Sequence, residues 1–375
     1  MKIFLLSPHF SQYSLSLALA LARDHEVLLV LNAVNAANEI PPGFIAPKGG
    51  NLRIERLPHD RRIMTLFRNL FRYWELYREF KPDLVHCQEE PKDYLVGFMA
   101  LVWRIPMVLT VHDPRPHVGL DMQRQRWSRL GLYMRFLRWR ADGVVVHGDQ
   151  LRLEALSTGH FRDVPVMSAP HGPYGVLGVS AAEVPSIAGS CLFFGRIERY
   201  KGLGVLIQAI NLLWERGLQA HAVIAGRGSD LARWKPDMQD RQRFTLIEKY
   251  LSPDEVQSVF QQAQLVVLPY LEGTQSGVAA YALGTGRPLV GTDVGSLADV
   301  IRHGRNGLLV PPGDASALAD ALAALIGDPA LCDRMGAQSL SLGQHELSWK
   351  VAAQVCSDLY RLCSGGRRAS MASGR

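Results

Sequence analysis

The chain has 375 residues, of which 47% are hydrophobic and 20% charged, and its formal net charge is +6. This composition is typical of a folded globular protein and argues against a mainly disordered chain. The length exceeds what one hydrophobic core usually serves, so two domains are expected. The five cysteines are an odd number without CxxC spacing, which predicts free thiols and neither a disulfide framework nor a zinc site.

Membrane insertion and export are not expected from the sequence. The longest apolar stretches, such as 95–102, are too short and too interrupted to cross a bilayer. Residues 1–20 do not have the pattern of a signal peptide. A cytoplasmic protein is therefore expected.

Short β-type runs alternate with helical patterns from the first residue onward. The runs predicted as buried parallel strands in the first half are 2–8, 26–32, 52–58, 83–87, 107–113 and 143–148. The segments between most of them, for example 14–23 and 94–103, are long enough for crossover helices. This alternation indicates a parallel sheet that is covered on both faces.

The segment 169–189 interrupts the alternation with Gly, Pro and Ser, which is typical of an interdomain linker. The alternation then restarts, and strands are predicted at 191–197, 222–226, 244–250, 265–270, 288–293 and 307–312. Helices are predicted at 203–216 and 254–262. The sequence therefore predicts an α/β protein with two doubly wound, Rossmann-like parallel-sheet domains that face a cleft.

The predicted domain organisation follows from these patterns. It consists of an N-terminal domain (1–172), a linker (173–189), a C-terminal domain (190–345), a helix that packs back on the first domain (346–364) and a disordered tail (365–375).

Two stretches of the first domain, 61–81 and 124–140, combine arginines with aromatic residues. One interpretation is a solvated helix face above ordinary core aromatics. The other is an interfacial helix on an anionic membrane surface, peripheral at the inner membrane face. No recognised nucleic-acid-binding motif accompanies the basic residues, so nucleic acid is not expected as a partner.

In open α/β sheets, ligands bind beyond the carboxyl ends of the strands, where helix N-termini expose their N–H groups. The turn GRIERYKG at 195–202 occupies such a place, and its Arg196 and Lys201 can direct two cations at one diphosphate. The alternative is two surface cations on a loop, and the spacing alone does not decide between them.

A second such place is LEGTQSGVAA at 271–280, between a strand and a helix. The small residues Thr274, Ser276 and Gly277 at the helix start leave N–H groups uncovered, which favours an anion site that needs no metal. Glu272 could accept hydrogen bonds from sugar hydroxyls or serve as a capping carboxylate.

Two glycine-containing turns, at 225–230 and 291–296, carry weaker signals. Gly226 and Gly228 in the first allow a ligand close to the backbone or simply form a turn. A structural turn is the default interpretation of the second.

In the first domain, His112 and Asp113 stand at the end of a predicted strand, where a substrate contact is expected. His9 after the first strand and His171 in the linker are further residues that could face the cleft. His9, Asp113 and His171 are therefore candidates for contact with a substrate from the side of the first domain.

Several other chemistries are disfavoured by missing motifs. The sequence has no Asp-x-Asp pair for a divalent metal, no GxSxG elbow, no Walker lysine motif, no HExxH and no GxGxxG after the first strand. These absences favour phosphate binding without a metal ion or another cofactor.

Taken together, these features resemble the family 4 glycosyltransferases of GT-B fold, a group of retaining enzymes that build bacterial glycans. The resemblance covers nearly the whole chain. Its most specific parts are the G-R-x-x-x-x-K-G motif at 195–202 and the segment 268–314.

The resemblance implies a nucleoside-diphosphate-sugar donor, with its diphosphate on Arg196, Lys201 and the N–H groups of Gly277 and Val278. It implies that His112 contacts the donor sugar or the acceptor. It also implies that the nucleobase lies near 248–250, that the C-terminal domain (190–345) binds the nucleotide sugar and that the N-terminal domain (1–172) is the acceptor side, with His9, Asp113 and His171 as acceptor-side residues. The motifs and the resemblance together predict that the donor is bound by Gly195, Gly226, Glu248, Tyr250, Thr274, Ser276, Gly277 and Val278. The residues they assign to catalysis are His112, Arg196, Lys201 and Glu272.

The sequence departs from the family pattern in two places. The family commonly has two glutamates separated by seven residues, but counting from Glu272 places Ala280 at the second position. With a one-residue insertion, the two positions are Gly273 and Tyr281. The usual Gly-Gly after the first strand is replaced by His-Phe-Ser-Gln at 9–12.

The expected function is a retaining, metal-independent transfer of a sugar to a glycan or lipid-linked acceptor, in polysaccharide or glycolipid synthesis. One alternative is a nucleotide-sugar epimerase of the same fold. Another is a catalytically inactive homologue that serves as a partner subunit, which the missing second glutamate suggests and the pair Arg196 and Lys201 argues against.

Overall fold

The computed structural model describes residues 1–41, 44, 50–58, 63–89, 102–103, 105–115, 129–161, 163–175, 185–273 and 275–373. The chain divides into two compact units. The first consists of Met1–Pro170 with Trp349–Arg375, and the second of His171–Ser348. Each unit is described by itself below.

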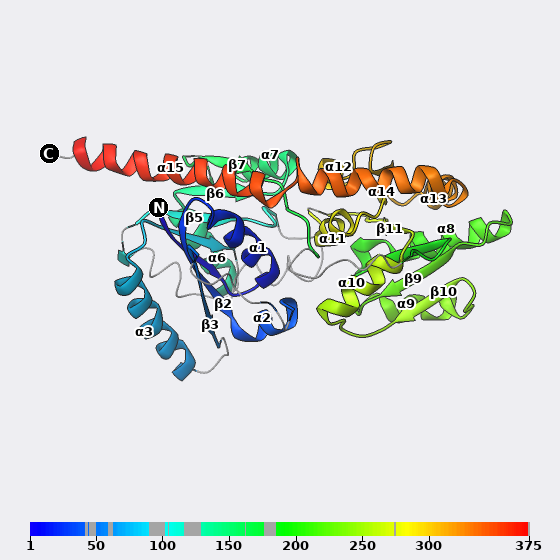
Figure 1. Cartoon of the computed structure of the whole chain (residues 1–375), viewed down its shortest axis with the longest axis horizontal. Helices are drawn as coiled ribbons and strands as arrows, with labels where there is room; N and C mark the ends of the chain where they lie inside the picture. Colours follow the sequence, from blue (N-terminus) through cyan, green and yellow to red (C-terminus); the bar gives the residue numbers. More distant parts are fainter. Residues whose placement is uncertain are drawn as a thin grey trace. The chain divides into compact units, whose positions relative to one another are not determined.

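The first unit is built around a seven-stranded parallel sheet with the order β3-β2-β1-β4-β5-β6-β7 (Figure 1). Its strands are β1 (Lys2–Ser7), β2 (Glu26–Asn32), β3 (Leu52–Leu57), β4 (Leu84–Gln88), β5 (Met107–Thr110), β6 (Gly143–Val146) and β7 (Val166–Ser168). Its helices are α1 (Ser11–Leu21), α2 (Ala33–Glu39), α3 (Ile63–Phe80), α6 (Arg129–Arg140), α7 (Asp149–Ser157) and α15 (Trp349–Ser373).

Strand alternation divides these helices between the two faces of the sheet. Val85 and Cys87 of β4 belong to a core cluster that includes buried residues of α3, α6 and α7. His86 points to the opposite face, where its Nδ1 lies 2.6 Å from the hydroxyl oxygen of Tyr360 in α15. Burial lowers the pKa of His86 to about 3, so this ring is neutral. The contact fixes α15 to the first unit.

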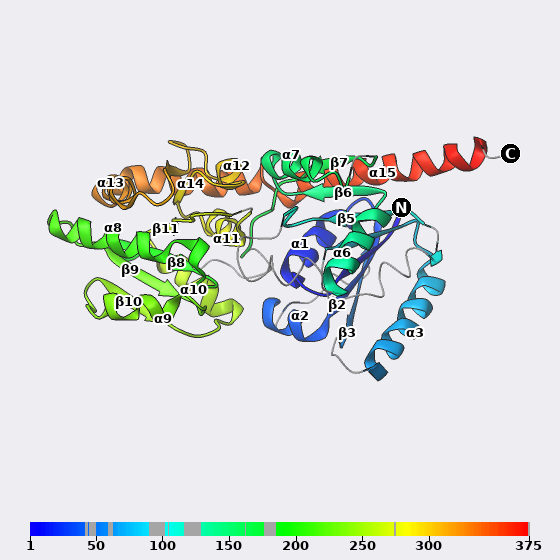
Figure 2. The ribbon, with the colours of Figure 1, turned by 180° about the vertical axis from the view of Figure 1, so that it is seen from behind.

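The second unit contains a six-stranded parallel sheet with the order β10-β9-β8-β11-β12-β13 (Figure 2). Its strands are β8 (Ser190–Phe194), β9 (His221–Ala225), β10 (Phe244–Ile247), β11 (Leu265–Leu268), β12 (Leu289–Thr292) and β13 (Gly307–Val310). Its α-helices are α8 (Leu203–Glu215), α9 (Leu231–Trp234), α10 (Pro253–Gln262), α11 (Gly277–Thr285), α12 (Leu297–Val300), α13 (Ala315–Gly327) and α14 (Pro329–Gln344). Two 3-10 helices, η1 (Arg199–Lys201) and η2 (Lys235–Met238), complete it.

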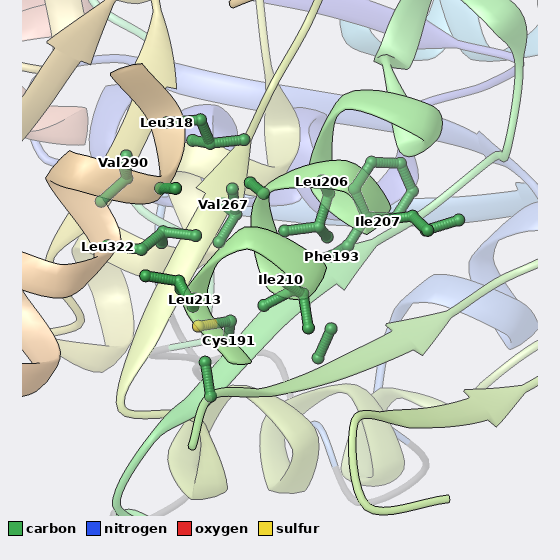
Figure 3. Packing of buried hydrophobic residues seen from close by; sticks show 14 of the residues in the cluster. Cys191, Phe193, Leu206, Ile207, Ile210, Leu213, Val267, Val290, Leu318 and Leu322 are labelled. Carbon is green, nitrogen blue, oxygen red and sulfur yellow. The ribbon is translucent and has the colours of Figure 1, made fainter. Parts of the chain in front are cut away.

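Helix α8 packs one side of this sheet through a continuous apolar stripe. Its Leu206, Ile210 and Leu213 are fully buried and lie over side chains of β8, β11 and α13, as Figure 3 shows. Apolar residues at i, i+4 and i+7 form one helix face, which is why this segment covers a sheet rather than joining it.

The predicted pair of Rossmann-like parallel-sheet domains is confirmed. The five cysteines are free, as expected, and all five are buried. The sequence did not predict β7, because a strand of three residues flanked by prolines leaves no alternating pattern. Most of the predicted helix at 94–103 lies outside the described residues.

The unit boundaries differ in detail from the predicted domains. The division falls after Pro170, so His171 belongs to the second unit. Helix α15 continues to Ser373, where a disordered tail was expected from residue 365. Arg, Ala, Met and Ser beyond residue 366 have adequate helix propensity, and no proline stops a helix that is already anchored.

Across the described residues, no single helix has the length and apolarity to span a membrane. One bent pair, Ala315–Gly327 with Pro329–Gly365, meets the length and composition requirements together.

Candidate functional site

The predicted phosphate-binding residues follow two neighbouring strands of the second sheet. β8 and β11 lie side by side, and the strand order reverses between them. Such a switch point opens a crevice beyond the carboxyl ends of the strands. The turn at Gly195 follows β8, and the segment leading to α11 follows β11. These two segments are therefore placed to share one ligand.

Backbone contacts hold the two segments together. The N–H of Leu271 donates to the carbonyl of Tyr200 over 2.7 Å. Gly202 has a φ of +70°, and a Cβ at this position would lie 1.9 Å from the carbonyl oxygen of Pro269. Only glycine fits this turn, which brings Lys201 beside β11.

Gly195 lies beside residues of both segments. It has a φ of +105°, and an ideal Cβ on it would lie 3.1 Å from Lys201 Nζ and 3.7 Å from Val278 Cγ2. The structure therefore brings together three residues that were predicted from two separate motifs.

Lys201 is only 8% exposed, and its ammonium lies 5.1 Å from the centre of the Tyr270 ring. Burial lowers the pKa of Lys201, and the charge of Arg196 lowers it further. Arg196 itself is exposed. Neither cation forms an ion pair with a carboxylate among the described residues. Because an unpaired buried ammonium is costly, an anionic ligand would be stabilised here.

Helix α11 directs its N-terminus at the same cluster. The Ser276 hydroxyl caps it by accepting from the N–H of Ala279 over 3.4 Å, and it lies 3.0 Å from the Tyr270 hydroxyl. The N–H groups of Gly277 and Val278 lie in the first turn, where a helix provides no carbonyl to accept from them. The first turn carries no acidic residue. These N–H groups and the helix dipole favour an anion.

The roles of two other residues predicted in this segment, Glu272 and Thr274, stay predictions. Glu272 is exposed, and its N–H lies 3.5 Å from the carbonyl oxygen of Tyr200. Its sugar-binding role stays a prediction. Thr274 lies outside the described residues.

Gly226 has a packing explanation. A Cβ on it would lie 1.9 Å from the carbonyl oxygen of Gly195, and one on Gly228 would lie 2.0 Å from that of Ile197. The glycines let the turn after β9 pack against the turn after β8, which favours the turn interpretation over ligand contact.

Glu248 and Tyr250 follow β10, which is two strands from β8 and thus roughly 10 Å away. Glu248 forms an ion pair of 2.6 Å with Lys235. Tyr250 is 70% exposed. Their predicted position near the nucleobase stays a prediction.

His171, expected on the acceptor side, lies beside the N-terminus of α11 through Tyr174. The His171 Nδ1–H donates to the Gly172 carbonyl over 2.9 Å, so Nε2 accepts from the Tyr174 hydroxyl over 3.2 Å. Burial lowers the pKa of His171 to about 4, which keeps it neutral. A Cβ on Gly277 would lie 3.4 Å from the Tyr174 ring. Tyr174 was not predicted, because nothing in its linker sequence marks it.

In the first unit, residues at the ends of β1, β4 and β5 converge. His112 is 5% exposed, and its Nε2 lies 2.9 Å from Gln88 Oε1. Its ring centre is 4.3 Å from that of Phe10 and 5.3 Å from that of His147. The Tyr13 ring packs against the rings of His112 and His147 and also against that of Trp349 in α15. Gln88, His147 and Trp349 had not been predicted.

The other two acceptor-side residues engage the chain through their backbones. The carbonyl of His9 accepts a short hydrogen bond from the Ser7 hydroxyl. The carbonyl of Asp113 accepts from Arg138 over 3.1 Å. Their substrate contacts stay predictions.

The N-terminus of α1 differs from that of α11. The N–H of Ser11 donates to Asn35 Oδ1 over 3.1 Å, and that of Gln12 donates to a carboxylate oxygen of Glu39 over 3.2 Å. A carboxylate from α2 therefore already occupies the position where an anion would bind. Neither Asn35 nor Glu39 was predicted. Within the described residues, the N-terminus of α11 is the more open of the two to phosphate.

Both halves of the chain match known family models. Residues 11–172 match the family model Glycosyltransferase Family 4, and residues 188–328 match Glycosyl transferases group 1. A D-inositol 3-phosphate glycosyltransferase of Corynebacterium efficiens is 31% identical over 313 residues, which cover 76% of this chain and 73% of that protein.

Other relatives match over a shorter length. An alpha-D-kanosaminyltransferase of Streptomyces kanamyceticus is 32% identical over 177 residues, 45% of each protein. A D-inositol 3-phosphate glycosyltransferase of Corynebacterium urealyticum is 33% identical over 48% of this chain and 45% of that protein. The chain thus spans a little under half the length of these two curated relatives.

Solved structures share the fold. Sucrose-phosphate synthase from Thermosynechococcus elongatus has a TM-score of 0.69 at 20% identity, covering 98% of this chain and 100% of that one. The catalytic domain of starch synthase IV from Arabidopsis thaliana has a TM-score of 0.68 at 12% identity, covering 97% and 99%. With both its halves matched and its fold shared, the chain belongs to the group 1, family 4 glycosyltransferases of GT-B fold.

Proposed function

We propose that the chain is a retaining glycosyltransferase that moves a sugar from a nucleoside diphosphate to a glycan or lipid-linked acceptor, in polysaccharide or glycolipid synthesis. The carrying observation is that the Lys201 ammonium and the first turn of α11 both lie beside Gly195, which the exposed Arg196 follows directly. Neither cation has a carboxylate partner among the described residues. Two cations and a helix dipole are suited to a diphosphate.

The relatives support this assignment through what they do. Several are glycosyltransferases by name, and a glycogen synthase of Mycobacterium tuberculosis is among them. Among the structures of the same fold, HepE of Anabaena was solved in complex with UDP-glucose. A nucleotide-sugar donor is the substrate class that fits both the relatives and the cation pair.

In the proposed reaction, the bond between the sugar and the donor phosphate breaks, and negative charge develops on the departing diphosphate. Lys201, Arg196 and the N–H groups of Gly277 and Val278 would stabilise this charge. We propose that no divalent cation is needed, because these groups supply the positive charge. His112 would contact the donor sugar or the acceptor.

A thermal-shift screen with UDP, GDP, ADP and their sugars tests donor binding. A ligand at a hundred times its Kd stabilises the protein by about 2.7 kcal/mol. Arg196→Ala should abolish most of the shift, whereas Arg199→Ala, an exposed arginine in the same turn, should preserve it. If no nucleotide stabilises the wild type, the inactive-subunit alternative is favoured.

Turnover separates the remaining alternatives. Release of nucleoside diphosphate that depends on an added acceptor and persists in EDTA supports a metal-independent transferase. Conversion of the donor sugar to its epimer without an acceptor would instead indicate an epimerase. The anomeric configuration of the product, read by NMR, tests retention.

A further inference from the structure

Helix α3 carries a row of large apolar side chains that face solvent. Met64, Phe67, Phe71 and Trp74 are 77%, 62%, 65% and 45% exposed. Their spacing of three, four and three residues places them along one stripe of the helix. Single exposed apolar residues are ordinary, but four aligned on one helix mark an interaction surface.

The opposite side of α3 already provides the packing that the fold needs. Asn69 and Tyr73 are almost fully buried, Leu76 is completely buried, and Tyr73 and Leu76 belong to the core of the first unit. The exposed stripe is therefore additional to the core-facing stripe. Figures 1 and 2 both draw α3 at the rim of the first unit.

Unpaired positive charge accompanies the stripe. Arg68 and Arg78 are exposed, and within the described residues neither is engaged in an ion pair. Arg72, in contrast, is paired with Glu55 and Glu75. The surface thus combines apolar side chains with two arginines that the described fold does not use.

Helix α6 adds to the same side of the sheet. It contributes Tyr133 and Leu137 to the core cluster that α3 also joins, so both helices cover one face. Its Leu132 and Trp139 are 58% and 70% exposed, and Arg135 is exposed as well.

We propose that the exposed stripe of α3, defined by Met64, Phe67, Phe71 and Trp74, docks on an anionic phospholipid bilayer, with Leu132 and Trp139 of α6 on the same side of the sheet. Amphipathic helices with aromatic and aliphatic residues on one side and arginines beside them insert that side into the headgroup boundary. The arginines are attracted to anionic lipid, and tryptophan favours the interface. A second copy of the chain fits less well, because a symmetric contact would bring two sets of unpaired arginines into one interface, where their like charges repel.

This inference concerns the first unit and does not depend on the proposed transferase activity. Donor binding is tested with soluble nucleotides and docking with lipid alone, so either can fail without the other. Together they would hold the enzyme beside a lipid-linked acceptor.

The test is co-sedimentation of the full chain with vesicles of phosphatidylcholine alone or with about 30% phosphatidylglycerol. The wild type is expected to bind the anionic vesicles at least about tenfold more strongly at low salt, and to lose much of this binding at about 0.5 M salt. The double variant Phe67→Ser with Phe71→Ser should lower binding by at least about tenfold, since two aromatic anchors are removed.

Leu362→Ser is the matched control, because Leu362 is 59% exposed but lies on α15, which packs on the opposite face of the sheet. It should bind as the wild type does. Equal loss in the control, or retained binding in the double variant, overturns the proposal. If the double variant does not fold, Arg68→Gln with Arg78→Gln must remove the preference for anionic lipid.

Gel filtration without lipid tests whether a second copy of the chain covers this surface instead. A wild-type dimer that the Phe67→Ser, Phe71→Ser change converts to a monomer, together with no vesicle binding, would overturn membrane docking and assign the face to a second copy. A monomer that binds anionic vesicles supports the proposal.

Discussion

Gly195 and Lys201 approach so closely that a Cβ on the glycine would lie 3.1 Å from the lysine ammonium. The turn after β8 therefore folds back so that the ammonium of Lys201 lies against the backbone of Gly195, the first residue of the turn. The ammonium is held between this backbone and the Tyr270 ring. Because Gly195 has no side chain, none lies between its backbone and the ammonium.

Gly195→Ala is expected to weaken nucleotide binding about tenfold, because the new methyl displaces the ammonium. It should also cost about 1 kcal/mol in free energy of unfolding, since φ is +105°. Gly217→Ala is the control, with a φ of +81° and nothing within 4 Å of its Cβ. It should lose similar stability and keep its affinity in titration calorimetry.

Lys201→Met should raise the stability of the nucleotide-free protein and lower nucleotide affinity at least about tenfold. The native pKa lies below the usual 10.5, so just below pH 10.5 the unfolded chain binds more protons than the native one. Wild-type stability therefore gains from this group as the pH rises through that window, and the variant should lack this gain.

Denaturant unfolding at several pH values checks the Lys201→Met prediction. Lys350→Met removes an exposed lysine and should change neither stability nor affinity. A Lys201→Met protein that is less stable at neutral pH and binds nucleotide normally would contradict the assigned role.

Ser276→Ala should cost about 1 kcal/mol, because the Ala279 N–H loses its cap and the Tyr270 hydroxyl loses a partner. Asp314→Ala removes an equivalent cap from α13, where Asp314 accepts from the N–H of Ala317 over 2.9 Å. Both variants should unfold at lower temperature, but only Ser276→Ala should bind nucleotide more weakly. Equal nucleotide affinity in the two would exclude a role for this helix terminus.

Glu39→Gln should change the pH dependence of stability. Burial raises the pKa of Glu39 above 4.5, so the native state binds more protons than the unfolded chain between 4.5 and the raised value. The contribution of Glu39 to stability therefore falls as the pH rises through this window. The difference between wild type and Glu39→Gln should follow that trend, whereas Glu26→Gln, an exposed carboxylate, is the control. A pH-independent difference for Glu39→Gln would refute the prediction.

The strands were predictable because buried parallel strands are short apolar runs, and Ile3 to Leu6 or Val266 to Leu268 show this directly. Placement of Arg196 and Lys201 also followed, since the turn after a strand is local. Contacts set by distant backbone were not predictable. Glu39 reaches Gln12 across 27 residues, and neither position has a pattern that indicates the other.

The position of Tyr174 shows the same limit. Its N–H donates to the Ala280 carbonyl over 3.0 Å, which places the ring at the start of α11. The pairing depends on how a linker crosses a finished domain. The spacing of residues in the sequence does not indicate where a linker runs over a domain.

Tyr360 joins His86 across 274 residues of sequence, and this separation determines when each unit can be completed on the ribosome. The second unit is one continuous segment and can fold as soon as it has emerged. The first unit begins earlier but stays unfinished until α15 has been synthesised. Maturation of the nascent chain therefore ends with the unit whose synthesis began first. A ribosome that stalls soon after Ser348 has emerged would hold a chain whose second unit is complete and whose first unit still lacks α15.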